Sequence, residues 1–513
     1  MTVQPFANAS AVIPARYARK FFVVPLNLEN GVLHVAHRQD GDGNVLGELA
    51  LLLGLEVTGE PYSETQLFDL LQKTYGVGAD AIDSLNANGH GVDLDKEEDQ
   101  ARSGYVQREL VDDTADDASI VSVVNELLLR AQQEGATDIH LEPLEYRVRV
   151  RFRIDGMLLE IAVPEGLVRY HPVVVSRIKV MANLDIAERR LPQDGRIKAT
   201  VGGVQNEYRV SVLPTQFGET IDIRVLTNSS ILTGLSGLGM WENEQAFIRK
   251  TLESPYGVML VTGPTGSGKT TSLYSFLNIM NETSRKIITI EDPIEYHLDG
   301  LTQLQVHPRI GLTFARGLRS MLRHDPDVMM VGEIRDQETA ETVIRVALTG
   351  HLVFSTVHTN DAPSTPARLL NMGIEPYLLA SSVRCILAQR LVRKICPACA
   401  EKDTQSYVKE LAAEMADQEI AGRLDGDIVF MTGAGCDKCH QTGFSGRTAI
   451  FEILPVTAKV QEQILSRAPA SELRKELKAV GTGTLRERGL ALAARGETSV
   501  SEVLRVTAGQ DGV

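Results

Sequence analysis

An eight-residue stretch, GPTGSGKT at residues 263–270, constrains the fold of this chain more than any other feature. The apolar run VMLVT precedes it, and SLYSFLNIM, which is typical of a helix, follows it. The pattern GxxxxGK followed by Ser or Thr predicts a phosphate-binding loop, because its glycines let successive backbone N–H groups turn inward around an anion. A strand, this loop and a helix in succession indicate an α/β domain.

Each part of the loop has an expected role in binding Mg-ATP and hydrolysing it. The ammonium group of Lys269 reaches the β- and γ-phosphates, and the hydroxyl of Thr270 coordinates Mg²⁺. The N-terminus of the following helix adds favourable partial charge. A glycine turn with a chance lysine is the alternative, and the flanking strand and helix argue against it. The residues expected to bind ATP and Mg²⁺ are Gly263, Pro264, Thr265, Gly266, Ser267, Gly268, Lys269, Thr270 and Thr271.

Apolar strands alternate with helical stretches after the loop. KIITIE, DVMMVGE and HLVFSTVH are dense in Val, Ile and Met, which is typical of a mostly parallel sheet covered on both faces. Two of these strands end in carboxylates, and hydrolysis needs one carboxylate to orient the water and another beside the metal. We expect Glu291 near the γ-phosphate, with Asp292 and Glu295 as alternatives, and Glu333 to hold magnesium through water. Structural salt bridges are the alternative for each.

The third strand contributes histidines. His358 follows its end, and we expect it to hydrogen-bond the γ-phosphate, although a core histidine is the alternative. His351 begins the same strand and is a weaker candidate.

Two CxxC pairs lie 36 residues apart, and a fifth cysteine, Cys385, sits in an apolar stretch where a buried side chain is expected. Two such knuckles complete a tetrahedral Cys₄ zinc site with no open position, so we predict a structural Zn²⁺. A redox dithiol is the competing interpretation, and His440 could replace one ligand. The predicted ligands are Cys396, Cys399, Cys436 and Cys439.

With 513 residues the chain is too long for one core, because cores stop growing at roughly 250–300 residues. No apolar run of about 18 residues is present, and the N-terminus does not read as a secretory signal, so we expect a cytoplasmic protein. Residues 76–118 hold twelve acidic and three basic residues and predict a mobile linker. The expected multidomain α/β organisation is a small α/β module at 1–75, the linker at 76–118, an α+β domain at 119–228, the parallel α/β domain at 229–395, the tetracysteine module at 396–441 and a helical part at 442–513.

The segment YRVRVRFRIDGMLLEI alternates strictly and predicts a half-buried strand followed by a hairpin turn at Asp155 and Gly156. Four guanidinium groups occupy one face of it, and they could meet a phosphate, an acidic partner surface or only solvent. These residues are Arg147, Arg149, Arg151 and Arg153.

These segments together resemble the traffic ATPases of bacterial type II secretion, the GspE family, and their sister pilus-assembly motors of the PilB type. The resemblance covers about residues 119–455. Its motifs are GPTGSGKTT, ITIEDPIEY, DPDVMMVGEIRD, GHLVFSTVHTND, DIHLEP, VRFRIDG, RLPQDGR and the tetracysteine element.

The resemblance implies a homo-hexamer in which ATP lies between a RecA-like P-loop ATPase domain at 229–395 and the smaller, PAS-like domain before it. It implies that Arg209 and Arg224 reach the nucleotide from that smaller domain, and that Glu291, Glu333 and His358 are functional. Arg319 and Arg323 resemble arginines that lie just before the strand DVMMVGE. Arginine suits this task because its planar fork can neutralise charge that spreads over the transferring phosphoryl oxygens.

The resemblance also implies partners. IPARYARKFFVVPL is similar to the segment that docks secretion ATPases, so residues 1–75 are expected to contact a GspL-like cytoplasmic domain at the inner membrane, with a GspF-like platform protein nearby. GFSGR stands where GYRGR is common in the family.

We therefore expect a cytoplasmic ATPase, docked peripherally on the inner membrane, that powers type II secretion by driving pseudopilus assembly. A PilB-type ATPase of type IV pilus extension is the nearest alternative. A nucleic-acid translocase with the same core is a further one, against which the net charge of −15 argues. A nucleotide-gated scaffold with negligible turnover is the last.

Overall fold

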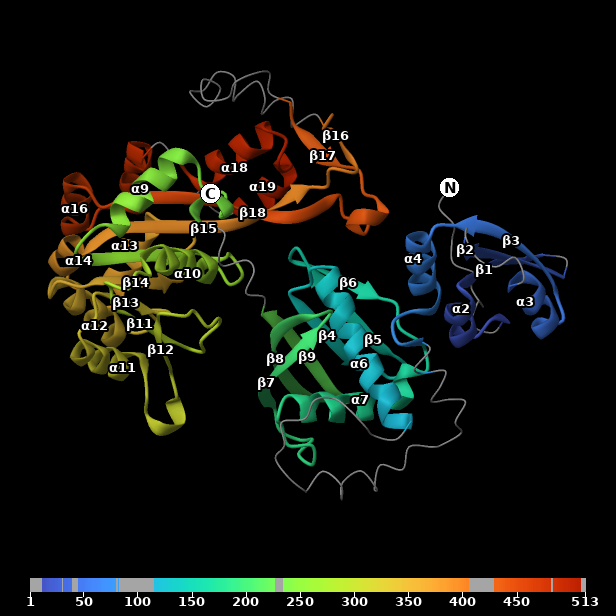
Figure 1. The fold of residues 1–513 in the computed structure, drawn as a ribbon. Coiled ribbons are helices and arrows are strands. Elements are labelled where there is room, and N and C mark those ends of the chain that lie inside the picture. The colour runs from blue at the N-terminus through green and yellow to red at the C-terminus, as the bar shows by residue number, and fades with distance from the viewer. Residues whose placement is uncertain are drawn as a thin grey trace. The chain divides into compact units, whose positions relative to one another are not determined.

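The computed structural model describes residues 12–29, 31–38, 45–79, 82, 115–226, 234–405, 429–480 and 483–508. The chain forms two compact units, Met1–Thr227 and Asn228–Val513 (Figure 1). Within the described ranges, no helix combines the length and the apolar character needed to span a bilayer.

The first unit begins with a three-stranded sheet in the order β1-β2-β3, in which β1 and β2 are antiparallel and β2 and β3 parallel. Strands and helices are both present, as the predicted small α/β module requires. Neither face of β3 is fully buried, and its residues lack the apolar alternation that identifies a half-buried strand. The elements are α2 (Ala15–Phe21), β1 (Val23–Glu29), β2 (Val32–Arg38), α3 (Val45–Leu53), β3 (Glu56–Tyr62) and α4 (Glu64–Tyr75).

Both ends of the predicted linker at 76–118 belong to folded structure, which corrects its boundaries. Val77 and Ile82 are buried in the core of the next domain, and the amide of Gly78 donates to Glu126 (3.0 Å). The helix α6 begins at Ala115 and ends at Gln133. Residues 80–81 and 83–114, which carry most of the acidic charge, lie outside the described residues.

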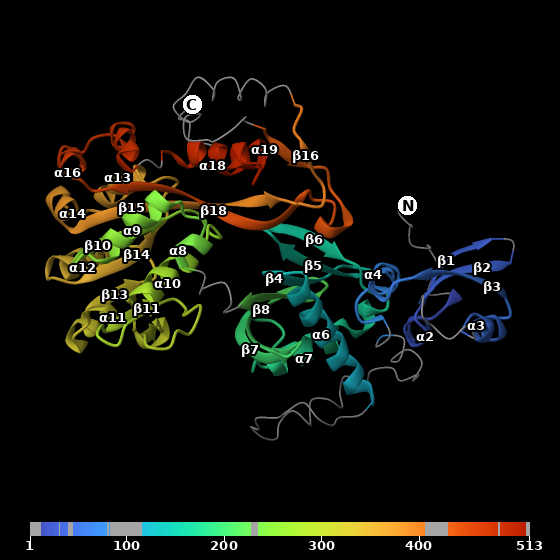
Figure 2. The ribbon, with the colours of Figure 1, turned by 45° about the horizontal axis from the view of Figure 1, so that its top comes forward.

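A six-stranded antiparallel sheet follows in the order β6-β5-β4-β9-β8-β7. The helices α6 and α7 pack their apolar side chains against one of its faces (Figure 2). Asp155 and Gly156 adopt φ of 48° and 83°, so the predicted hairpin turn is confirmed. The elements are β4 (Asp138–Pro143), β5 (Val148–Ile154), β6 (Met157–Ile161), α7 (Leu167–Met181), β7 (Gln193–Val201), β8 (Val204–Thr215) and β9 (Gly218–Leu226).

The arginines of β5, and Arg147 just before it, form ion pairs with carboxylates of the neighbouring strands. Arg149 and Arg151 both donate to Glu142, and Arg147 pairs with Glu160. Of the three alternatives left open for this row, a phosphate, an acidic partner surface or solvent, none is needed to pair these three arginines, because carboxylates of the same domain already do so.

The second unit contains a seven-stranded sheet in the order β12-β11-β13-β14-β10-β15-β18. Every pairing is parallel except that of β15 with β18, which confirms the predicted α/β class with a mostly parallel sheet. The strands are β10 (Gly257–Thr262), β11 (Ile287–Glu291), β12 (Thr302–Gln305), β13 (Val328–Val331), β14 (Leu352–Val357), β15 (Val383–Ile395) and β18 (Phe444–Pro455).

Helices cover both faces of this sheet (Figure 1). Met259 and Val261 of β10 face one helical layer, and Val258 and Leu260 face the other. The first layer comprises α8 (Gly234–Gly237), α9 (Glu242–Leu252) and α10 (Lys269–Met280). The second includes α11 (Phe314–Met321), α12 (Gln337–Leu348), α13 (Ser364–Asn371), α14 (Pro376–Ser382) and α16 (Ala458–Leu465).

The sequence predicted a helical part at residues 442–513, and this prediction is wrong in one respect: β18 lies there and forms an edge of the main sheet. Its residues from Ala449 to Pro455 are all buried, so the strand lacks the alternation that identifies half-buried strands. The remaining elements are η2 (Pro308–Ile310), η3 (Leu322–His324), β16 (Ala400–Lys402), β17 (Met431–Gly433), η5 (Asp437–Cys439), α17 (Ala470–Leu473), η6 (Arg474–Val480), α18 (Leu485–Ala494) and α19 (Val500–Thr507).

Candidate functional site

The glycine-rich loop connects β10 to α10, as predicted. Gly266 and Gly268 have φ of 78° and 87°, a region that glycine adopts without strain. A Cβ atom at Gly263 would lie 2.6 Å from the carbonyl oxygen of Gln389, so this position also requires glycine. The hydroxyl of Ser267 is buried without a hydrogen-bond partner among the described residues. The loop therefore has a backbone conformation that suits a bound phosphate. The Ser267 hydroxyl is a hydrogen-bond donor that a phosphate could satisfy.

Lys269 and the first turn of α10 complete the loop. The ammonium group donates to the carbonyl oxygens of Gly263 (2.8 Å) and Pro264 (2.9 Å), so it curls back over the loop. Burial and the positive charge of Arg390 lower the pKa of Lys269 to about 8, although Glu333 opposes this shift. Pro264, Thr265 and Gly266 are exposed, and Thr270 and Thr271 are half-buried in the first turn of the helix.

Glu333 and His358 meet at the carboxyl edge of the parallel sheet. Glu333 follows β13 and His358 follows β14, and these strands are parallel neighbours. Glu333 Oε2 lies 3.3 Å from His358 Nε2, and Glu333 Oε1 lies 2.5 Å from the guanidinium of Arg335. The field of Asp292 also reaches Arg335 and helps to raise its pKa. The predicted Glu333 and His358 are thus brought together beside the loop, whereas Arg335 was not anticipated.

Glu291 ends β11 at the same edge, but its carboxylate lies inward. It accepts hydrogen bonds from Tyr274 (2.5 Å), Thr289 (2.6 Å) and Gln303 (3.3 Å). Burial raises the pKa of Glu291, although these hydrogen bonds oppose the shift. The carboxylate expected near the γ-phosphate is therefore held against the helix that follows the loop.

Gln389 and Arg390 lie beneath the loop on β15, and the sequence analysis did not single them out. Gln389 accepts from the hydroxyl of Ser272 (2.7 Å) and packs beside Gly268. Both residues are buried in the middle of this strand, whereas its other charged residues, Arg384, Arg393 and Lys394, lie nearer its ends and are less buried. Because the strand holds three other charged residues, the sequence alone does not single out this pair; its burial, which usually requires hydrogen-bond partners, is seen in the structure.

His351 has its ring nitrogen 3.2 Å from the carbonyl oxygen of Val346. Arg319 pairs with Glu338, and Arg323 donates to the carbonyl of Arg319 within its own helical segment. These three side chains therefore contact residues close to them in the structure, and none of these contacts is with the phosphate loop.

Arg209 and Arg224 lie opposite each other on β8 and β9 of the first unit. Arg224 Nε donates to Asp138 (2.8 Å), which directly faces it on β4. Residues that face each other across antiparallel strands point to the same side of the sheet, so these arginines belong to one polar row.

The four predicted cysteine ligands converge, because all their Sγ atoms lie within 4.8 Å of one another. Sγ separations of 3.9 Å (Cys396 to Cys436), 3.8 Å (Cys399 to Cys439) and 3.7 Å (Cys436 to Cys439) are far longer than a disulfide bond of about 2.05 Å. A tetrahedral ion with Zn–S bonds of about 2.3 Å places its sulfurs roughly 3.8 Å apart. This group can therefore hold a metal ion. Cys385 lies apart, buried in β15 as expected.

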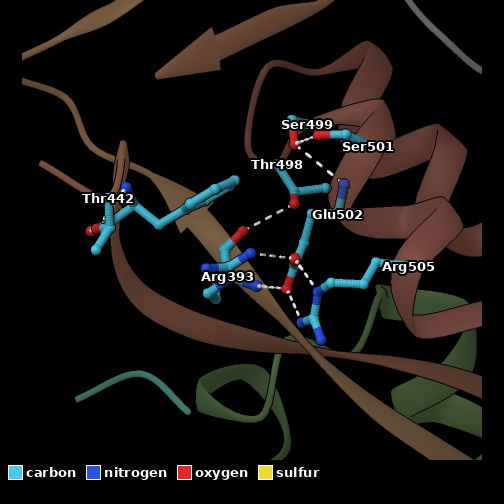
Figure 3. Close-up of polar contacts among 8 residues, drawn as sticks. Arg393, Thr442, Thr498, Ser499, Ser501, Glu502 and Arg505 are labelled. Carbon is cyan, nitrogen blue, oxygen red and sulfur yellow. Dashed lines mark hydrogen bonds and ion pairs between the residues drawn. The ribbon is translucent and has the colours of Figure 1, made fainter. Parts of the chain in front are cut away.

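An ion cluster around the buried Glu502 links the end of β15, just before the cysteine module, to the helix α19 (Figure 3). Glu502 of α19 accepts from Arg393 (2.7 Å) at the end of β15 and from Arg505 (2.7 and 2.8 Å). The Arg393 guanidinium also lies 4.1 Å from the centre of the Phe444 ring. Despite its burial, these hydrogen bonds and charges lower the pKa of Glu502 to about 2. Glu502 thus holds Arg393, which precedes the cysteine module, and Arg393 in turn stacks on Phe444, which follows the module.

Comparison with known proteins agrees with this geometry. A family model described as type II/IV secretion system protein matches residues 113–505. The chain is 42% identical over 499 residues to the type IV pilus assembly ATPase PilB of Myxococcus xanthus, covering 97% of this chain and 86% of that protein. It is 45% identical over 401 residues to the type II secretion system ATPase E of Vibrio cholerae, covering 78% of each.

Solved structures give the same fold. The ATPase DotB of Legionella pneumophila superposes with a TM-score of 0.53 at 23% identity, covering 75% of this chain and 95% of that chain. The pilus retraction motor PilT with bound ADP superposes with a TM-score of 0.50 at 24% identity, covering 76% and 98%. At such identities these likenesses establish a P-loop ATPase fold. The family model spans most of the chain, and the PilB and ATPase E relatives cover 97% and 78% of it at more than 40% identity, so the chain belongs to the type II/IV secretion system protein family.

Proposed function

We propose that this chain is the ATPase of a type II secretion machine, which couples ATP hydrolysis to pseudopilus assembly. The observation that carries the proposal is the phosphate loop with Lys269 beside the paired Glu333 and His358 at one edge of a parallel sheet. The relatives named as type II secretion ATPases support the choice of machine.

In the proposed mechanism, the loop amides and Lys269 bind the triphosphate, and Thr270 and Glu333 would hold Mg²⁺, which supplies charge neutralisation when bound. His358 would hydrogen-bond the γ-phosphate, and Glu291 would orient water after leaving its buried position. Arg209 and Arg224 would neutralise the charge that develops on the transferring phosphoryl group. The supply of these arginines by a separate unit would couple chemistry to movement.

We also propose that the four cysteines hold a structural Zn²⁺. The sulfur separations support a tetrahedral ion of this size, and the amides of Cys436 and Gly443 donate to the sulfur of Cys439. Burial opposes the thiolate of Cys439, but these hydrogen bonds outweigh it and lower the pKa to about 6. With four protein ligands, no position remains for a reactive water.

The proposed assembly is a cytoplasmic homo-hexamer, docked on the inner membrane through a GspL-like domain and a GspF-like platform protein, without direct nucleic-acid contact. The similarity to PilB over 97% of the chain favours pilus extension as the second candidate. Both candidates share the chemistry and differ in the partner.

The chemistry is tested by ATP turnover of the purified chain beside Lys269→Ala and Glu333→Gln, alone and with cytoplasmic domains of candidate partners. We expect both substitutions to abolish turnover, and Lys269→Ala to weaken nucleotide binding as well. Unchanged turnover in Lys269→Ala would refute the ATPase assignment. Deletion of the gene then separates the machines, since loss of exported proteins indicates secretion and loss of surface pili indicates extension.

A further inference from the structure

We propose that Arg390 is a positioning residue for ATP hydrolysis, which fixes the loop that carries His358 against the phosphate-binding loop. The inference rests on the proposed ATPase function and adds to it a residue outside the family motifs quoted above.

The guanidinium of Arg390 hydrogen-bonds the loop that carries His358 and lies close to the first residue of the phosphate loop. Its Nη2 donates to the carbonyl oxygen of Asn360 (2.7 Å), two residues after His358. Its Nη1 donates to the carbonyl oxygen of Gln389 (3.1 Å) and would lie 3.1 Å from a Cβ atom at Gly263, the first residue of the phosphate loop. One planar, rigid group thus spans from one loop to the other, which a flexible ammonium group could not do with the same geometry.

The loop after β14 is fastened on its other sides too. The hydroxyl of Thr262, the last residue of β10, hydrogen-bonds the backbone of Val357 and both the backbone and the hydroxyl of Thr359. Asp361 accepts from Arg474 (2.7 Å). The loop is therefore held in one position relative to β10, and Arg390 and Arg474 both contribute a cation to that attachment.

The charges around Arg390 explain how a cation is retained there. The side chain is 7% exposed. Burial lowers the pKa of Arg390, but the carboxylates of Glu452 and Asp361 oppose this shift. Its positive charge also acts on Lys269 and helps to lower the pKa of that residue. Arg390 thus interacts electrostatically with two carboxylates, Glu452 and Asp361, and with the ammonium group of Lys269.

This arrangement predicts an effect on catalysis that is separate from nucleotide binding. The glycine loop and Lys269 can bind ADP without the His358 loop, whereas hydrolysis requires His358 and Glu333 in register with the γ-phosphate. A small displacement of catalytic groups is costly to the rate, so loss of Arg390 should lower kcat about 10- to 100-fold. ADP affinity and the melting temperature without nucleotide should change little.

The test compares Arg390→Gln and Arg390→Lys with the wild-type chain. Arg384→Gln is the matched control, because Arg384 lies on the same strand and its side chain contacts Tyr256, at the end of β10 away from the phosphate loop. We expect lower kcat in both Arg390 variants, less so in Arg390→Lys, and wild-type kcat in Arg384→Gln. If Arg390→Gln does not fold, Arg390→Lys decides the question, and wild-type kcat in that variant would overturn the proposal.

A double-mutant cycle shows whether Arg390 acts through the His358 loop. Once His358→Ala has removed the histidine, Arg390→Gln should cause little further loss, because coupled residues are non-additive. Multiplicative losses, or equal losses of ADP affinity, kcat and melting temperature, would instead assign Arg390 a purely structural role.

Discussion

Glu291 illustrates, at the scale of a single residue, how burial and chemistry compete at a strand end. Its carboxylate is satisfied by Tyr274, Thr289 and Gln303, whereas a water-orienting role needs it to reach the nucleotide. Both hydroxyl partners can reverse their donor and acceptor roles, so the fold should tolerate an amide at this position.

Glu291→Gln distinguishes a role in orienting water from a purely structural role of this carboxylate. If Glu291 orients water, kcat should fall about 10²- to 10⁴-fold while ATP affinity and the melting temperature are retained. Steady-state turnover, isothermal titration with Mg-ATP and thermal unfolding measure the three quantities. A lower melting temperature with near-normal kcat would show that the carboxylate is structural.

Glu452 predicts a pH dependence of stability. It accepts from the amides of Ala362 and Leu485, yet burial and the charge of Asp361 raise its pKa to about 7. A carboxyl whose pKa is raised in the folded state stabilises most below its unfolded pKa, and this contribution is lost as the pH rises through about 7. Between pH 4.5 and pH 7, the two pKa values of Glu452, the free energy of unfolding should fall by roughly 3 kcal/mol. Urea unfolding at pH 5 and pH 8 measures it, and Glu452→Gln should lack this component. An equal pH dependence in both proteins would contradict it.

At the scale of elements, the cysteine module depends on both its sulfurs and its anchor. Serine is a poor zinc ligand, so the quadruple substitution of Cys396, Cys399, Cys436 and Cys439 by Ser should remove about one zinc per chain, measured by atomic emission. Cys385→Ser is the matched control and should keep its metal. Equal metal content in all three proteins would exclude the site.

Glu502→Ala should weaken the anchor between β15 and α19. Removal of one partner from a buried pair leaves an uncompensated charge, which costs about 3–5 kcal/mol. Unfolding by urea measures the loss, and zinc release to a chelator should accelerate. Arg505→Gln is the control, because this arginine is 59% exposed and an exposed pair contributes at most about 1 kcal/mol. Similar losses in both variants would refute the anchor role.

The elements also show what could be predicted from the sequence. The phosphate loop, the β5–β6 hairpin and the cysteine knuckles were predictable, because each depends on residues adjacent in the chain. β18 and the Gln389–Arg390 pair were not, since their partners are distant in sequence: Ser272 lies 117 residues from Gln389. The inward position of Glu291 was unforeseen for the same reason, because Tyr274 and Gln303 come from other elements.

At the scale of the whole molecule, the proposed mechanism draws on residues of both compact units. The phosphate loop belongs to the second unit, whereas the row that contains Arg209, Arg224 and Asp138 belongs to the first. Arg224 is paired with Asp138 in this structure, so contact with a nucleotide would exchange one anion for another.

Arg224→Gln tests that exchange. If Arg224 neutralises charge in the transition state, kcat should fall about 10²- to 10³-fold with little change in ADP affinity. Asp138 would still have Arg153 nearby (3.7 Å), so the sheet should remain folded. Arg147→Gln is the matched control, because Arg147 pairs with Glu160 at an exposed position of the same sheet and should leave turnover unchanged. Comparable turnover in Arg224→Gln and Arg147→Gln would mean that the nucleotide is hydrolysed by the second unit's residues without this arginine.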